Sequence, residues 1–186
     1  MKLHKFRLIA FFSFILVITS FSSCSDDDDR GYWLNGGYVD FRVEVETYNN
    51  GTFEDYIVLT TDFLRDANNR WVDPYSIDNW RIREEIDETF IEITNWRIYG
   101  NGYMDRFEIF VDGKSVYVYK GDPIELLGSD PAYIDDYESL DAAYYIVDRL
   151  IRFGEVEVVV RGRTNLLNAA EPIYFDFYNG VDFYIR

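Results

Sequence analysis

The pattern that most limits what this chain can fold into is an alternation of apolar and polar side chains, interrupted by turn dipeptides. In residues 38–48 (YVDFRVEVETY) every second position is apolar: Val39, Phe41, Val43 and Val45. Successive side chains of a β-strand point to opposite faces, so this period predicts a strand with one buried face.

Similar patterns predict further strands joined by short turns. The predicted strands cover residues 53–61, 89–99, 103–111, 115–119, 155–162, 173–178 and 181–185. Asn101-Gly102, Asp112-Gly113 and Asn179-Gly180 are predicted to be hairpin turns, because these dipeptides adopt positive φ at little cost. A helical spacing of apolar residues predicts one helix that begins near Asp130-Pro131, or alternatively with Ser139 as its N-cap, and ends at Gly154.

These elements predict a single, mainly β domain over residues 38–186. Strands joined by tight turns, with one helix as a crossover, favour an antiparallel Greek-key β-sandwich that resembles immunoglobulin-like modules. A lipocalin-like barrel is the alternative.

The first 23 residues have the composition of an export signal. Lys2, Lys5 and Arg7 precede an apolar run over residues 8–18. That run is shorter than the roughly 20 apolar residues that span a bilayer as a helix. A basic start, a short apolar run and small residues after it are typical of a secretory signal peptide, which is removed from the mature protein.

The residues after this segment indicate a lipid anchor. A short apolar run that is followed by small residues and Cys24 resembles a bacterial lipoprotein signal. The residues after the cysteine are Ser25, Asp26, Asp27, Asp28 and Asp29. An acidic run in this place resembles the export signal of surface lipoproteins of the Bacteroides group. The resemblance implies acyl chains on Cys24, palmitate among them, a lipidated acidic tether over residues 24–37, and an outer-membrane location facing the cell exterior.

The charge of the chain excludes one large class of partners. It contains 18 Lys and Arg residues and 34 Asp and Glu residues, which gives a net charge of −16. Removal of the signal peptide takes three basic residues away and makes the mature chain more acidic. Such a protein repels phosphate groups, so we predict no nucleic-acid binding.

The mature chain also lacks two residue types that much enzyme chemistry needs. His4, the only histidine, lies in the signal segment, and Cys24 is the only cysteine. Histidine-dependent triads, cysteine nucleophiles and the common zinc sites are therefore excluded. The acids around Asp130 and in residues 66–70 lack the glycine-bearing loop of an EF-hand. We predict a protein that is not an enzyme, with no catalytic residue, cofactor or metal.

One long segment, residues 62–80, has neither strand nor helix periodicity. It contains three large aromatic residues, Trp71, Tyr75 and Trp80, and the flanking acids Asp73 and Asp78. Flat aromatic rings can stack on sugar rings while carboxylates accept hydrogen bonds from sugar hydroxyls, so these five residues are the predicted ligand-binding site. The alternative is that the rings close the end of the sandwich as part of its core.

Two hypotheses for function follow. The first is a cell-surface lipoprotein that acts as a non-catalytic binding module, with a polysaccharide ligand, in an outer-membrane uptake system. The second is a structural or assembly lipoprotein that docks another outer-membrane protein. In both, the acyl chains on Cys24 attach the protein to the outer membrane.

We expect that Cys24→Ala releases the protein from the membrane fraction, because the acyl chains on this cysteine are the predicted attachment to the membrane. Immunoblots of soluble and membrane fractions measure this. Replacement of Asp26 to Asp29 by alanine serves as the control and is expected to leave the protein membrane-bound but protected from external protease. A Cys24→Ala variant that stays in the membrane fraction would contradict the lipid anchor.

Overall fold

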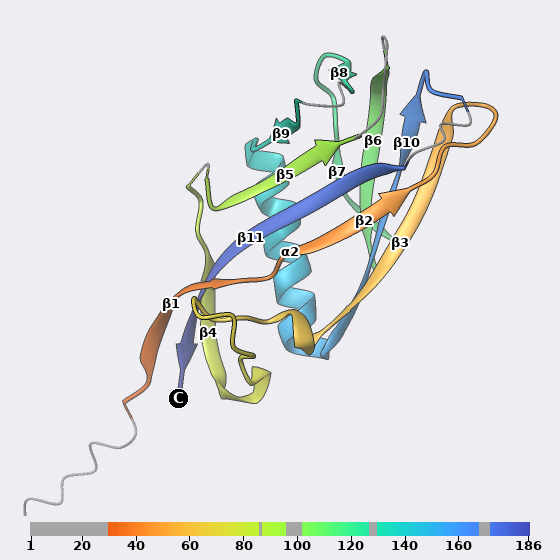
Figure 1. Cartoon of the computed structure of the whole chain (residues 1–186). Helices are drawn as coiled ribbons and strands as arrows, with labels where there is room; N and C mark the ends of the chain where they lie inside the picture. The colour runs from red at the N-terminus through yellow and green to blue at the C-terminus, as the bar shows by residue number, and fades with distance from the viewer. Residues whose placement is uncertain (1–29, 86, 96–101, 127–129, 168–171) are drawn as a thin grey trace, which may run out of the picture. The chain divides into compact units, whose positions relative to one another are not determined.

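Two antiparallel β-sheets and one helix make up the fold in the computed structural model (Figure 1). The structure describes residues 30–85, 87–95, 102–126, 130–167 and 172–186. Residues 32–185 form one compact unit. The signal segment, Cys24 and the acidic run lie outside the described residues.

The first sheet has six strands arranged around a long C-terminal strand. They are β1 (Tyr32–Tyr38), β2 (Phe41–Val45), β4 (Ile77–Ile82), β5 (Thr89–Thr94), β9 (Ala132–Ile134) and β11 (Ile173–Ile185). The main path runs β1-β11-β5-β9, and both β2 and β4 also pair with β11.

The second sheet has five strands in the order β3-β10-β6-β7, with β8 beside β6. They are β3 (Thr52–Thr60), β6 (Tyr103–Val111), β7 (Lys114–Val118), β8 (Ile124–Glu125) and β10 (Glu155–Thr164). The remaining elements are two short 3₁₀ helices, η1 (Thr61–Phe63) and η2 (Pro74–Ser76), and the helix α2 (Tyr137–Phe153).

The core lies between the two sheets. Phe53 and Phe107 of the second sheet contact Phe175 of β11 at ring-centroid distances of 5.9 and 5.3 Å. The helix α2 connects β9 of one sheet to β10 of the other and contacts strands of both sheets (Figure 1). Its buried face includes Ile146 and Leu150.

The predicted antiparallel β-sandwich with one crossover helix is confirmed. The alternative, a lipocalin-like barrel, was wrong, because the two sheets remain separate and do not close on each other in the described residues. Within the same ranges, no helix is both long and apolar enough to cross a membrane.

The prediction of a hairpin at Asn179-Gly180 was wrong. β11 runs without interruption through both residues, and neither has a positive φ. Asn179 is buried and its Nδ2 donates to the carbonyl of Val39 at 2.6 Å. A Cβ added to Gly180 would lie 2.9 Å from the carbonyl oxygen of Glu88. The glycine is thus required for a close approach of two backbones, a role that a sequence cannot distinguish from a turn.

β11 changes its neighbours at this point. Residues 173–179 pair with β2 on one side and β5 on the other. Residues 180–185 pair with β1 and β4 instead. One strand therefore holds together four others, and the exchange of neighbours happens where Gly180 leaves space.

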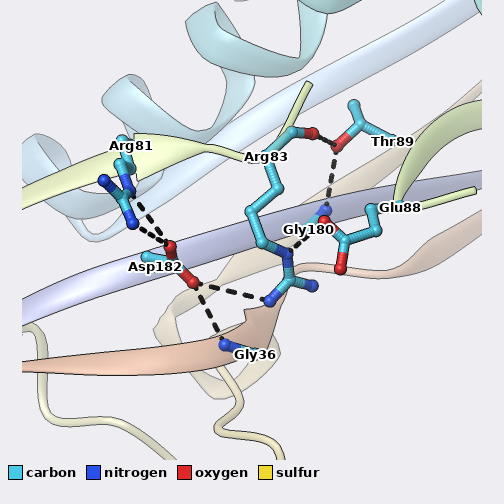
Figure 2. A network of polar contacts seen from close by, with 7 residues as sticks. All are labelled: Gly36, Arg81, Arg83, Glu88, Thr89, Gly180 and Asp182. Carbon is cyan, nitrogen blue, oxygen red and sulfur yellow. Dashed lines mark hydrogen bonds and ion pairs between the residues drawn. The ribbon is translucent and has the colours of Figure 1, made fainter. Parts of the chain in front are cut away.

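A polar network at the exchange point joins three strands (Figure 2). The buried carboxylate of Asp182 on β11 accepts hydrogen bonds from Nε and Nη2 of Arg81 at 3.0 and 2.9 Å and from the backbone nitrogen of Gly36 at 3.1 Å. Arg83 lies 3.5 Å from the same carboxylate and 2.9 Å from Glu88. The network fixes β1 and β4 to β11.

The N-terminal part of the domain contains more strand than predicted. β1 occupies residues 32–38, most of which the sequence assigned to the tether, and the predicted strand at 38–48 is interrupted after Tyr38, so that β2 starts at Phe41. Gly36 has φ of +78° and a register shift lies between Leu34 and Gly37. The glycines therefore form a bulge in a strand, where the sequence suggested a flexible leader.

The helix also begins later than the first prediction. Residues 132–134 form β9, and α2 starts at Tyr137 with Asp136 as its N-cap, which lies between the two predicted starts. Asp136 Oδ1 accepts a hydrogen bond from the backbone of Ser139 at 2.7 Å. The predicted C-cap is confirmed, because Gly154 has φ of +81°.

The predicted turn at Asp112-Gly113 is confirmed, with φ of 48° and 77°. Positive φ at both central residues is the signature of a type I′ hairpin turn. The predicted turn at Asn101-Gly102 stays a prediction, because Asn101 lies outside the described residues.

We expect Gly180→Ala to lower the free energy of unfolding by about 1–3 kcal/mol, since the added methyl overpacks the contact with the Glu88 backbone. Chemical denaturation measures this. Glu44→Ala, an exposed change on the neighbouring strand β2, is the control and should stay within roughly 0.5 kcal/mol of the wild type. A neutral Gly180→Ala would contradict the close approach.

Candidate functional site

The three predicted aromatic residues do not form one platform. Trp80 lies on β4, the last part of the segment predicted to be irregular, and is half-buried. Its ring packs on Tyr144 of α2 with centroids 4.6 Å apart. Trp80 therefore belongs to the packing between β4 and the helix, as the alternative interpretation expected.

Trp71 and Tyr75 lie outside the core. The Trp71 side chain is 52% exposed and its Nε1 donates to the carbonyl of Thr61 at 3.0 Å. Tyr75 is 98% exposed on η2. The structure shows no ring contact among Trp71, Tyr75 and Trp80, all of which it describes. A residue as exposed as Tyr75 has nothing to hold its ring in a fixed orientation.

The two predicted acids lie apart from each other in role, one at the start of a short helix and the other on a strand. Asp73 is the N-cap of η2, and its Oδ1 accepts from the backbone of Tyr75 at 3.0 Å. Asp78 is exposed on β4. The predicted site thus supplies one fully exposed ring and a capping carboxylate, and it brings together no group of side chains that could surround a ligand.

A different hollow lies on the second sheet. An open groove of about 720 Å³ is formed by side chains of β3, β6 and β10 and by Tyr48, which precedes β3. Its lining residues are Tyr48, Thr52, Phe53, Glu54, Arg106, Glu108, Arg161, Gly162 and Arg163. We call this hollow the arginine groove.

The strand register explains why these side chains meet. Thr52, Arg163 and Arg106 are direct neighbours across β3, β10 and β6. Two residues further along, Glu54, Arg161 and Glu108 form the next row. Directly opposite residues of antiparallel strands share a face, so both rows project from the outer side of the sheet.

The guanidinium groups in the groove are only partly engaged. Arg163 NH2 lies 3.2 Å from Asp105 Oδ2. Arg106 and Arg161 lie 3.8 and 3.7 Å from one oxygen of Glu108. These two distances are too long for hydrogen bonds. The other carboxylate oxygen of Glu108 accepts from Ser115 Oγ at 2.7 Å.

Apolar side chains continue the face beyond the groove. The third row is Tyr56, Val159 and Phe110, and Tyr56 is 61% exposed. Beyond it, a second hollow of about 510 Å³ is lined by Val58, Asp112, Arg149, Phe153, Glu155 and Glu157. The outer face of the second sheet therefore has two hollows separated by an apolar row.

Two tyrosine rings on β11, in the first sheet, are partly covered by neighbours. Tyr178 stacks on Phe90 with centroids 4.6 Å apart, and the guanidinium of Arg42 lies 4.8 Å above the ring of Tyr174. Ring faces that are occupied by neighbours offer little area to a ligand. Arg42 also makes a bidentate ion pair with the nearly buried Asp176.

Acidic and phenolic groups elsewhere have structural partners. Asp66 accepts hydrogen bonds from the backbone and guanidinium of Arg70, and these bonds lower the pKa of its carboxyl group. Tyr117 is buried, and burial raises the pKa of its hydroxyl well above the usual value. That hydroxyl donates to Asp136 Oδ2 at 2.7 Å. Among the described residues, no three His, Cys, Asp or Glu side chains gather as metal ligands do.

The comparisons with known proteins add no family assignment. No protein-family model and no curated protein matches the chain.

Sequence reasoning missed the arginine groove although part of the signal was present. The alternation at 155–162 assigns Val156, Val158 and Val160 to the core, and these valines are buried. The same alternation assigns Arg161 and Arg163 to the outer face. The register with β3 and β6, which brings Glu54 and Arg106 beside them, depends on long-range pairing that the sequence does not reveal.

We expect Trp80→Ala to cost about 2–3 kcal/mol of stability, somewhat less than the roughly 3–5 kcal/mol for a fully buried tryptophan, because its ring is half-buried against α2. Trp71→Ala should cost only about 1 kcal/mol, the net value of one hydrogen bond. Denaturant unfolding of both variants measures the difference. Equal, small effects would place Trp80 outside the core and restore the aromatic platform.

Proposed function

We propose that this protein is a non-catalytic binding module, displayed on the cell surface by a lipid anchor, that binds a glycan along the outer face of its five-stranded sheet. The arginine groove is the observation that carries the proposal. It combines an exposed tyrosine ring with arginine and glutamate side chains, the groups that stack on sugar rings and bond to sugar hydroxyls. Its volume of about 720 Å³ lies within the range of roughly 300–1,000 Å³ typical of ligand sites.

The chemistry of the groove fits sugar hydroxyls. Guanidinium groups provide several N–H donors in a fixed fork, and carboxylates accept two hydrogen bonds. One row across the sheet has the order Glu54, Arg161 and Glu108, so an arginine donor lies between two carboxylate acceptors. Tyr48, which is 56% exposed, adds an aromatic ring at one side.

The shape of the face fits an elongated ligand. From the row of Thr52 to that of Val58 the strand β3 advances six residues, about 20 Å at the usual rise of a strand. Tyr56 lies between the arginine groove and the second hollow. A polysaccharide chain that runs along β3 and β10 can therefore occupy both hollows and contact the apolar row between them.

A rigid sheet is a suitable support for such a site. Residues 155–163 of β10 pair on both sides along most of their length, with β3 and with β6. Side chains that project from a paired central strand are held more firmly than those of a loop. A pre-organised site loses less conformational entropy when a ligand binds.

Docking of another surface protein is the second candidate. Val58 and Phe153 are 42% and 62% exposed at the second hollow, next to the exposed Tyr56. Contiguous exposed apolar side chains are typical of protein interfaces. This alternative uses the apolar end of the same face, so variants at the two ends can separate the two functions.

The test is affinity electrophoresis of the lipidated protein in detergent, through gels that contain single soluble polysaccharides. We expect retardation by at least one polysaccharide. Tyr48→Ala and Tyr56→Ala should each weaken the retardation by roughly fivefold, since a stacked aromatic contact contributes about 1 kcal/mol. The melting temperature of both variants should remain close to that of the wild type, because both rings are exposed.

Tyr75→Ala is the matched control, a tyrosine that is exposed on the predicted loop and away from the groove, and it should migrate like the wild type. Release of reducing sugar from the retarding polysaccharide would show that the module is an enzyme after all. An absence of retardation in every gel, together with a Val58→Asp change that abolishes co-purification of a membrane partner, would favour the docking function.

A further inference from the structure

Two arginines face each other across neighbouring strands in the arginine groove. Arg163 of β10 is directly opposite Arg106 of β6. Both side chains are about two-thirds exposed, at 66% and 64%. Like charges directly opposite each other destabilise a strand pair. Each arginine also has an ion pair with one acid, Asp105 for Arg163 and Glu108 for Arg106. Two exposed guanidinium groups that face each other are an arrangement expected where a ligand makes use of the charges.

Two guanidinium groups of the groove have an ion-pair partner but no hydrogen bond among the residues that the structure describes. Glu108 is shared by Arg106 and Arg161 at distances beyond hydrogen-bond range. Neither guanidinium donates a hydrogen bond to any residue that the structure describes. An arginine fork fits two oxygens of an anionic group with parallel hydrogen bonds, and such charge-assisted bonds are stronger than neutral ones.

The positions of two of these groups are fixed without a ligand. The guanidinium of Arg161 lies 3.8 Å above the ring of Phe110. Arg163 is held by its ion pair with Asp105 at 3.2 Å. A cation over an aromatic face is stabilised while the edges of its plane stay open to donate. Binding then requires little ordering of long side chains.

We propose that the glycan bound by this protein is acidic, and that its carboxylate or sulfate groups bind to Arg106, Arg161 and Arg163. This inference depends on the proposed function and specifies the class of ligand. The two anionic groups share the chemistry that a guanidinium fork recognises, and the experiment distinguishes them.

The charge distribution of the molecule supports this ligand class. The chain as a whole has a net charge of −16, so most of its surface repels an anion. In the arginine groove three arginines line the same hollow as two glutamates, and Asp105, which pairs with Arg163, balances the third positive charge. The second hollow contains Asp112, Glu155 and Glu157 beside Arg149 alone. An acidic glycan is therefore directed to one end of the face, with its anionic groups at the arginines.

The experiment measures binding of the lipidated protein in detergent to two pairs of probes by calorimetry. Polygalacturonate is compared with its carboxyl-reduced form, and sulfated carrageenan with neutral agarose oligosaccharides. We expect the acidic member of at least one pair to bind at least tenfold more tightly than its neutral counterpart, and the affinity to fall as salt is added. The pair that shows the difference identifies the anionic group.

Arg106→Gln and Arg163→Gln should each reduce the affinity for the acidic probe by about tenfold or more. Each change removes the repulsion between the two arginines and also one ion pair of a largely exposed side chain, which contributes little to stability. The melting temperature should therefore stay close to that of the wild type, whereas loss of a structural arginine would lower it. Lys120→Gln, which removes one exposed positive charge outside the groove, is the control and should bind like the wild type.

Tighter binding of the neutral probes, with both arginine variants unchanged, would overturn the acidic ligand but leave the glycan-binding function intact. An absence of binding to all four probes in calorimetry, with no retardation by any polysaccharide, would overturn both. Equally tight binding of polyglutamate, competitive with the acidic glycan, would replace the glycan by an acidic protein partner.

Discussion

The fold depends on the exchange of neighbours along β11. This strand pairs with β2 and β5 in its first half and with β1 and β4 in its second half. The exchange requires Gly180, because any side chain there would meet the backbone of Glu88. The carboxylate of Asp182, buried among Arg81, Arg83 and Gly36, then holds the new neighbours in place (Figure 2). Asp182 is buried while the Arg81 side chain is 62% exposed, so removal of its partners would leave a buried carboxylate without compensation.

The other parts of the molecule follow from this arrangement. The odd-numbered residues of β11 from Ile173 to Phe183 are buried, and Phe175 among them contacts Phe53 and Phe107 of the second sheet. The helix α2 packs its apolar face against strands of both sheets. With the inner faces of both sheets occupied in this way, the outer face of the second sheet is free to present a binding surface.

That outer face combines charges in a way that does not serve stability alone. Arg106 and Arg163 are placed opposite each other, although each also has an ion pair with one acid, Glu108 or Asp105. Natural proteins keep such unfavourable arrangements mainly at functional sites. In a strongly acidic protein, a cluster of arginines also attracts anionic ligands that the rest of the surface repels.

The fold class and most strands could be predicted from the sequence, because alternation and turn dipeptides are local signals. The valines of β10, the turn at Asp112-Gly113 and the cap at Gly154 could all be predicted for this reason. The continuation of a strand through Asn179-Gly180 and the packing of Trp80 on α2 depend on long-range contacts, and the folded structure alone reveals them. It also reveals which residues line the arginine groove, since the register between β3, β10 and β6 depends on contacts between segments distant in the chain.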